Sequence, residues 1–495
     1  MFTYAKPEEV GISSKNIKRY IEVLEKAGLS THSVIIARHD KIVYENYWAP
    51  FHKDFLHRMY SVTKSFVALG IGCLIQEGKL SLDDKIVDLF PAEITEGACE
   101  NVKKQTIKNM LMMSTGYPVS MPGNWFTRRH PDRLRDYFES SGIGTFSKTP
   151  GSFFDYDSFG SFVLGALVED LSGMSLMDYL RSKFLDKIGF SKEAHFLKCP
   201  GGHAWGDSAL MCTSLDLLKA IKFTMNLGSW EGEQLMDKEY VQTAVSNLIP
   251  THHGEYPAVY GYGYQIWRLR DNSFFFNGMG CQFGVCVPDK DLLFVYNGDN
   301  QGNESAKTVI LDNFFNLIAD ETGEPMTAND TEYHALTEYS SSLILHHCGE
   351  SVPETVAEQI NGKTYYLDEN PMGIQFVRFT FNGETGMLEY KNEQGEKKLP
   401  FGMGKNVFGK FPQEGYSDEI GGIYEPGHYL DCAVSAQWLA KHILYLSVQV
   451  IDKYFGRSHM YFSFMENGEI LVRMEKTAED FLNEYCGKAK GKAQA

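Results

Sequence analysis

The sequence lacks the signals that direct a chain into or across a membrane. Its first ten residues contain no apolar h-region, so we expect no signal peptide. No window approaches the roughly 20 uninterrupted apolar residues of a spanning helix, so no membrane partner is expected. The nine cysteines are dispersed, and no two form a Cys-x-x-Cys motif. These features favour a cytoplasmic protein with free thiols.

Positive charge is also scarce. The chain has 47 Lys and Arg residues against 64 Asp and Glu residues, and its formal net charge is -17. Nucleic acids attract basic proteins, so a nucleic-acid partner is not expected. The 15 histidines form no zinc-ligand pattern, and we read the pairs His252-His253 and His346-His347 as loop residues. The sequence therefore predicts neither a metal nor another cofactor, and it leaves the oligomeric state open.

The order of sequence patterns predicts two domains in the 495 residues. A helix and a hairpin come first, helices fill the middle, and apolar strands follow from Gly261. This order predicts an α+β domain over residues 1–325, in which an antiparallel sheet is flanked by helices and carries an inserted all-helical subdomain. The polar stretch 326–345 predicts a linker. Strands and Asn-Gly turns predict an all-β sandwich or barrel over 346–495, with a short helix from Thr477 and a disordered tail.

The single Ser-x-x-Lys motif, Ser61-x-x-Lys64, opens the most apolar helix of the N-terminal half. Residues three apart on a helix share one face. A serine hydroxyl becomes a nucleophile when a base lies within hydrogen-bond reach, and lysine serves as that base when burial lowers its pKa. The motif therefore indicates a Ser61 nucleophile with Lys64 as its base. The alternative is a helix N-cap serine followed by a surface lysine.

Two further stretches carry groups that a serine hydrolase needs. Tyr156 follows a Pro-Gly turn and precedes an apolar helix, so its phenol could shuttle a proton beside Ser61, although core packing explains an isolated tyrosine as well. Glycines also interrupt an apolar strand at Gly278, which indicates close approach of its backbone to another group. That group is either a substrate carbonyl, held by the N–H groups of Ser61 and Met279, or nothing more than a β-bulge.

These three motifs, in this order, resemble the serine beta-lactamase/penicillin-recognising superfamily. Over roughly residues 5–320 the chain is most similar to the branch with class C beta-lactamases, DD-peptidases, D-aminopeptidases and family VIII-type esterases. The resemblance implies that Ser61 is acylated, that Lys64 is its base, and that Tyr156 passes the proton to the leaving group.

Two positions depart from the pattern of this superfamily. Ser158 stands where class C enzymes usually carry asparagine, and Phe276-Asn277-Gly278 replaces Lys-Thr-Gly or His-x-Gly. The second change removes the cation that would hold a substrate carboxylate, so a neutral ester or amide fits better. We expect the substrate to lie among five residues: Trp125, Ser158, Asn277, Gly278 and Met279.

Three functions stay open at this stage. The first is a carboxylesterase-like serine hydrolase that acts on a small ester or amide through an acyl-enzyme. The second is a D-aminopeptidase, DD-peptidase or beta-lactamase-type amidase. The third is a non-catalytic binding protein that retains the fold, against which the intact Ser61, Lys64 and Tyr156 argue.

Overall fold

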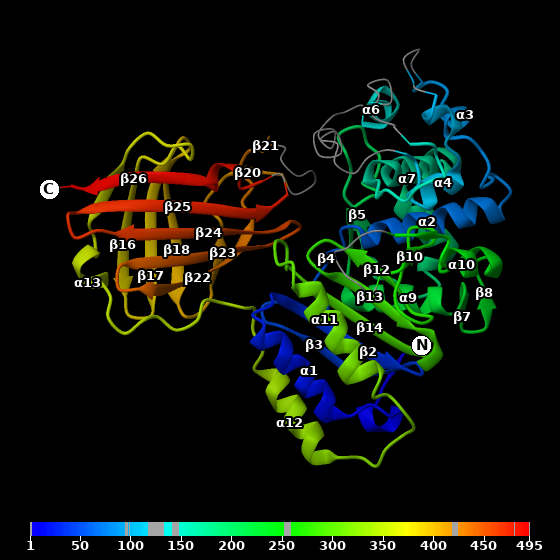
Figure 1. Cartoon of the computed structure of the whole chain (residues 1–495), viewed down its shortest axis with the longest axis horizontal. Coiled ribbons are helices and arrows are strands. Elements are labelled where there is room, and N and C mark those ends of the chain that lie inside the picture. Colours follow the sequence, from blue (N-terminus) through cyan, green and yellow to red (C-terminus); the bar gives the residue numbers. More distant parts are fainter. Residues whose placement is uncertain are drawn as a thin grey trace. The chain divides into compact units, whose positions relative to one another are not determined.

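The computed structural model describes residues 2–94, 98, 100–116, 133–140, 148–251, 259–417, 424–479 and 481–494 (Figure 1). The chain divides into two compact units, Met1–Ile344 and Leu345–Ala495. The first unit contains mixed helix and sheet, and the second is almost entirely β (Figure 1).

A nine-stranded sheet forms the centre of the first unit, in the order β1-β3-β2-β14-β13-β12-β11-β10-β9. Its neighbouring strands are antiparallel, except that β1 and β3 are parallel. The strands are β1 (Thr3–Tyr4), β2 (Thr31–Arg38), β3 (Lys41–Tyr47), β9 (Ile249–Pro250), β10 (Gly261–Tyr262), β11 (Trp267–Arg268), β12 (Phe274–Gly278), β13 (Gln282–Val287) and β14 (Leu292–Gly298).

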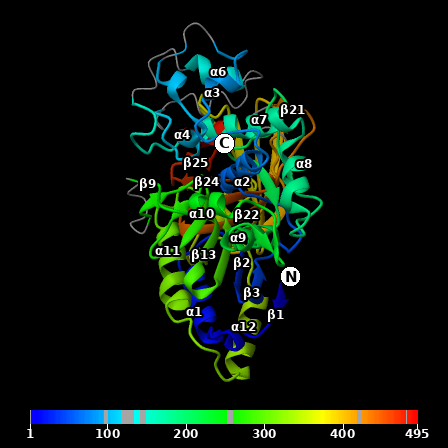
Figure 2. The same cartoon turned by 90° about the vertical axis from the view of Figure 1, so that its right-hand side faces the viewer.

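Helices cover both faces of this sheet, which can be followed in Figures 1 and 2. Helix α1 (Ser14–Lys26) buries residues at helical spacing, and these share one core cluster with Val34 of β2 and with α11 (Ala306–Phe314). On the opposite face α9 (Ser214–Met225) lies so close to β13 that a side chain at Gly284 would meet Ile221 at 2.7 Å. Because both faces are covered, the central strands are apolar throughout.

The segment between β3 and β10 is mainly helical. All residues of α2 (Val62–Gln76) up to Leu74 are buried, because its apolar side chains surround the whole helix. The other helices there are α3 (Ile86–Leu89), α4 (Ile107–Leu111), α6 (Arg133–Ser140), α7 (Ser158–Ser172), α8 (Leu176–Leu180) and α10 (Lys238–Ala244). Among the described residues no single helix could cross a membrane by length and composition, although the bent pair Ser158–Ser172 and Leu176–Leu185 passes when taken together.

The expectation of an all-helical insertion is wrong in detail. Strands β4 (His57–Arg58), β6 (Leu210–Cys212) and β5 (His195–Phe196) form a small sheet, and β7 (Ser229–Trp230) pairs with β8 (Glu233–Gln234). Strands of two or three residues are too short to show a period-2 pattern in the sequence.

The linker predicted over 326–345 is also wrong, because most of it forms helix α12 (Asp330–Ser341) of the first unit. Leu336 of this helix belongs to the core cluster that contains α1. Its Ser340 hydroxyl lies 3.0 Å from the hydroxyl of Tyr44. Only a few side chains of α12 are buried, so its polar composition concealed the helix.

The second unit is a barrel-like β domain built from a ten-stranded sheet, in the order β18-β17-β16-β15-β26-β25-β24-β23-β22-β19. A further pairing between β18 and β22 joins two strands that are distant in this order, so the sheet closes on itself. The strands are β15 (Thr364–Leu367), β16 (Phe376–Asn382), β17 (Thr385–Asn392), β18 (Gly395–Met403), β19 (Val407–Lys410), β22 (Asp431–Ala440), β23 (Ile443–Ile451), β24 (Phe455–Phe464), β25 (Glu469–Ala478) and β26 (Gly487–Ala493).

The end of the chain differs from the sequence-based expectation. Strand β25 continues to Ala478, where we expected a helix from Thr477, and the described part of the expected disordered tail is largely strand β26. Lysines on β26 alternate with glycine and alanine, and Ala489 and Gly491 point into the barrel-like domain. This weakly apolar alternation is easily mistaken for a polar tail.

Candidate active site

Ser61 and Lys64 lie against each other at the start of α2. The Lys64 Nζ atom donates a hydrogen bond of 2.9 Å to Ser61 Oγ and another of 2.6 Å to the carbonyl oxygen of Asp207. Lys64 is 1% exposed, whereas Ser61 is partly exposed. Within the described residues, Ser61 makes no side-chain capping bond to α2. The alternative of a capping serine followed by a surface lysine therefore does not describe this pair.

The backbone just before Ser61 is held in an unusual conformation. Tyr60 has φ of 46°, in the left-handed region that a bulky residue seldom adopts. The Arg58 guanidinium lies 4.6 Å from the centre of the Tyr60 ring, and both side chains are buried. Such strain persists where the surroundings enforce it, and it concentrates at functional sites.

Tyr156, from a distant part of the chain, reaches the same place. The Lys64 Nζ atom lies 5.1 Å from the centre of the Tyr156 ring. The ring also stacks on Trp267 of β11 at 5.5 Å, with 25° between the planes. Tyr156 is partly exposed, so its phenol is not enclosed in the core. The structure therefore brings together the three residues that the sequence motifs single out, and Trp267 joins them.

The residue after Tyr156 is a buried carboxylic acid. Asp157 is the N-cap of α7 and accepts hydrogen bonds from the Gly160 N–H at 3.0 Å and the Thr115 hydroxyl at 2.9 Å. Burial raises the pKa of Asp157 to about 6, although these hydrogen bonds and the charge of Lys64 oppose the shift. Ser158, the first residue of α7, is partly exposed.

A buried ion pair lies behind Lys64. Arg133 Nη2 is 3.2 Å from a carboxylate oxygen of Asp207, and both side chains are fully buried. The guanidinium also lies 4.1 Å from the centre of the Phe162 ring. Because the carbonyl of Asp207 accepts from Lys64, this pair fixes an acceptor for the lysine. Neither residue belongs to a sequence motif, and 74 positions separate them in the chain, so no local pattern indicates this pair.

The glycine-bearing stretch forms a hairpin between β12 and β13. The strands pair in regular register from Phe274 to Gly278, and the turn that follows has left-handed residues at Gly280 and Cys281. The paired part of the two strands shows no register shift. A side chain at Gly278 would meet the carbonyl oxygen of Met59 at 2.3 Å. The close approach predicted there is thus made to the backbone two residues before Ser61.

The same hairpin presents Met279 near the start of α2. Gln282 Nε2 donates to the Met279 carbonyl at 2.9 Å and fixes the turn from inside. In the described part of the chain, neither the Met279 N–H nor the Ser61 N–H donates to a protein group. Asn277 and Met279 are partly exposed and Gly278 is buried.

Trp125 lies outside the described residues. No group of three or more His, Cys, Asp or Glu side chains within the described ranges is placed to hold a metal ion.

Comparison with known proteins places these elements in a family context. The family model described as Beta-lactamase matches residues 17–312. The 6-aminohexanoate-dimer hydrolase of Paenarthrobacter ureafaciens is 22% identical over 229 residues, which cover 44% of this chain and 57% of that protein. Penicillin-binding protein 4* of Bacillus subtilis is 23% identical over 36% of this chain and 41% of its own. The chain thus matches about half the length of these curated relatives.

One solved structure is similar over both units. The octameric penicillin-binding protein homologue from Pyrococcus abyssi has a TM-score of 0.50 and 16% identity, and it covers 96% of this chain and 99% of its own. At this identity the likeness concerns the fold alone.

Proposed function

Since the chain belongs to the beta-lactamase family, a family of serine hydrolases, we propose that it hydrolyses a small neutral ester or amide through an acyl-enzyme on Ser61. The observation that carries the proposal is the hydrogen bond between Lys64 Nζ and Ser61 Oγ, formed by a lysine that is removed from water. A buried amine beside a partly exposed hydroxyl is the arrangement that activates a serine.

In the first half-reaction, neutral Lys64 accepts the hydroxyl proton of Ser61 as Oγ attacks the substrate carbonyl carbon. The carbonyl of Asp207 keeps Nζ in place while it gains this proton. Collapse of the tetrahedral intermediate breaks the bond to the leaving group, which takes a proton through the Tyr156 phenol. A water molecule then attacks the acyl-enzyme, and its proton passes back through the same groups as the acid leaves Ser61.

The negative charge that develops on the substrate carbonyl oxygen must be stabilised by hydrogen-bond donors. The N–H groups of Ser61 and Met279 serve in this role, because both lack a protein acceptor in the described part of the chain and Gly278 packs against Met59. Fixed N–H donors of this kind contribute about 10²–10³-fold each to the rate.

The substrate preference follows from Asn277. An amide at this position offers hydrogen bonds but no positive charge, so a substrate carboxylate gains no ion pair there. Ser158 and Met279, both partly exposed, complete a neutral lining. This favours an ester or amide without a carboxylate over a D-alanyl peptide or a beta-lactam.

The experiment that tests this function compares wild type, Ser61→Ala and Ser341→Ala on p-nitrophenyl butyrate. We expect kcat/KM to fall by at least about 10³-fold in Ser61→Ala, since the nucleophile is lost. Ser341→Ala, an exposed serine at the end of α12, is the matched control and keeps wild-type activity. Equal hydrolysis by Ser61→Ala and wild type would contradict the proposal. Nitrocefin and D-alanine amide in the same panel test the amidase alternative, which predicts preference for these two substrates.

A further inference from the structure

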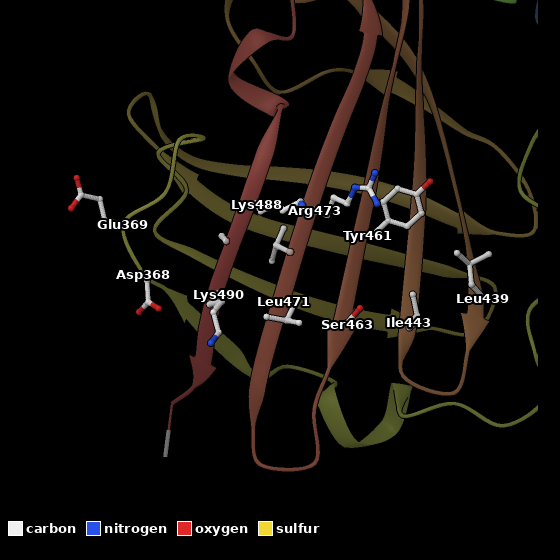
Figure 3. A pocket seen from close by; sticks show the side chains of 12 residues that line it. Asp368, Glu369, Leu439, Ile443, Tyr461, Ser463, Leu471, Arg473, Lys488 and Lys490 are labelled. Carbon is white, nitrogen blue, oxygen red and sulfur yellow. The ribbon is translucent and has the colours of Figure 1, made fainter. Parts of the chain in front are cut away.

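The outer face of the barrel-like domain has a groove of about 680 Å³ (Figure 3). Apolar side chains of Leu439, Ile443 and Leu471 line one part of it, and the cationic side chains of Arg473, Lys488 and Lys490 line another. Leu439 is 45% exposed and Leu471 is 38% exposed, so the apolar part faces solvent. Large exposed apolar side chains gathered in a hollow mark a binding site more often than scattered ones do.

The pairing of five strands creates this groove. Ile443, Ser463, Leu471 and Lys490 lie in one row across β23 to β26, because each is the register partner of the next. Tyr461, Arg473 and Lys488 form the neighbouring row. Alternate residues of a strand point to opposite faces, so the outward rows alternate with buried residues such as Ile470. Val472 and Ala489, which are also buried, line the floor of the groove between the two rows.

An aromatic stack fixes the shape of the second row. The Tyr461 ring stacks on Tyr445 at 4.9 Å, and the Tyr445 hydroxyl lies 2.7 Å from His459 Nδ1. The Arg473 guanidinium lies 5.9 Å from the centre of the Tyr461 ring. Arg473 is thereby held beside an aromatic surface, and it forms an ion pair with Glu475, to which both its Nε atom, at 3.0 Å, and its Nη2 atom donate. A guanidinium fixed in this way can offer its remaining donors to a ligand.

The lining of the groove carries three cations, Arg473, Lys488 and Lys490, and two carboxylates, Asp368 and Glu369. Lys488 and Lys490 form no ion pair with any described residue. Figure 3 shows Lys488 beside Arg473, whereas Asp368 and Glu369 lie on the other side of β26. Three cations thus line one groove, although the chain as a whole has a formal net charge of -17. Because Glu475 takes Nε and Nη2 of Arg473, the groups left to bind one negative group at this end are Nη1 of Arg473 and the ammonium group of Lys488.

We propose that this groove binds a small amphipathic carboxylate. Arg473 and Lys488 hold the carboxylate, and the apolar part of the ligand lies over Leu471 toward Ile443 and Leu439. From β26 to β23 there are three strand spacings, about 14 Å, which suits an alkyl chain of medium length. The site lies in the second unit and does not depend on the reaction proposed for Ser61.

The experiment titrates the full-length protein with octanoate in a calorimeter. Wild type is compared with Arg473→Gln/Lys488→Gln and with Lys492→Gln, an exposed lysine on the same strand and face outside the groove. We expect the double variant to bind octanoate at least about tenfold more weakly, because charged hydrogen bonds are lost. Lys492→Gln should change the affinity less than about twofold.

A further variant separates the contribution of apolar contacts to octanoate binding from the contribution of charge. Leu471→Lys adds a cation but removes apolar surface, so we expect weaker octanoate binding, whereas a purely electrostatic patch would bind more tightly. Three outcomes overturn the proposal: no saturable binding to wild type, equal loss in Lys492→Gln and the double variant, or tighter binding by Leu471→Lys. If octanoate bound near Ser61 instead, its affinity would be the same in wild type and in all of these variants. That result would also overturn the proposal.

Discussion

Lys64 Nζ donates both to Ser61 Oγ, at 2.9 Å, and to the carbonyl oxygen of Asp207, at 2.6 Å. The lysine is therefore fixed by a group on a different segment as well as by its own helix. Asp207 is in turn held by Arg133 in a buried ion pair. This series of contacts connects the geometry of the nucleophile to the packing of the helical segment.

Replacing Tyr156 by phenylalanine tests the proton shuttle. The ring and its stacking on Trp267 remain, and only the hydroxyl is lost. We expect kcat for p-nitrophenyl butyrate to fall by about 10²–10⁴-fold, as for the loss of a general acid–base group. KM and the midpoint of thermal unfolding should change little. The exposed Tyr366→Phe serves as control, and an unchanged kcat in Tyr156→Phe would remove the phenol from the mechanism.

Asp157 predicts a specific pH dependence of stability. Burial raises its pKa from 3.8 to about 6, so between these values the folded state binds more protons than the unfolded state. The contribution of Asp157 is therefore fully present below about pH 4 and is lost as pH rises to about 6. At about 1.4 kcal/mol for each pH unit, the loss is on the order of 3 kcal/mol.

Urea unfolding of wild type and Asp157→Asn between pH 4 and 7 measures this effect. Asparagine keeps the N-cap but does not titrate. The free energy of unfolding of wild type should therefore decrease relative to Asp157→Asn as pH rises from 4 to 6. The exposed Asp83→Asn is the control, and its difference from wild type should not follow this course. Parallel curves for wild type and Asp157→Asn would show that Asp157 is not desolvated.

Removing Arg133 should destabilise the first unit strongly. Arg133→Met leaves the Asp207 carboxylate buried without its cation, which costs about 3–5 kcal/mol. The double variant Arg133→Met/Asp207→Asn removes both charges and should recover much of this loss. Chemical unfolding of wild type, Arg133→Met, Asp207→Asn and the double variant gives the coupling energy. A double variant no more stable than Arg133→Met would mean that the ion pair is not the source of the effect.

Gly278 should not tolerate a side chain. A methyl group there would lie 2.3 Å from the Met59 carbonyl oxygen, so the hairpin must move away from the backbone before Ser61. Overpacking of this kind costs about 1–3 kcal/mol, and the displacement of Met279 should also lower ester hydrolysis. Gly323→Ala, where a methyl group meets open space, is the control. Wild-type stability and activity in Gly278→Ala would contradict the close packing described here.

Local patterns in the sequence predicted the parts of the site that lie close together in the chain. Ser61 and Lys64 meet because one helical turn separates them, which requires no knowledge of the tertiary structure. Tyr156 was a candidate because it lies between a Pro-Gly turn and an apolar helix, and the resemblance to a family then gave it a role beside Lys64. Trp267 and the pair Arg133–Asp207 carried no signal, because their contacts arise only when distant segments pack.

In the fold, too, some elements could be predicted from local sequence patterns and others could not. Apolar strands such as β14 and apolar helices such as α2 could be predicted, because burial on all sides leaves a continuous apolar run. Helix α12 and strand β26 could not, because most of their side chains face solvent and their composition is polar. Elements with little buried surface owe their structure to the neighbours they pair with, and the sequence alone does not identify those neighbours.

The most direct test of the account is covalent labelling of Ser61. The intact protein is treated with a fluorophosphonate, and its mass and the labelled peptide are determined alongside residual p-nitrophenyl butyrate hydrolysis. We predict one added phosphonyl group, located on Ser61, with loss of hydrolysis in proportion to labelling, and no label on Ser61→Ala. An unlabelled protein, or a label on another residue that abolishes hydrolysis, would contradict the assignment of Ser61 as the nucleophile.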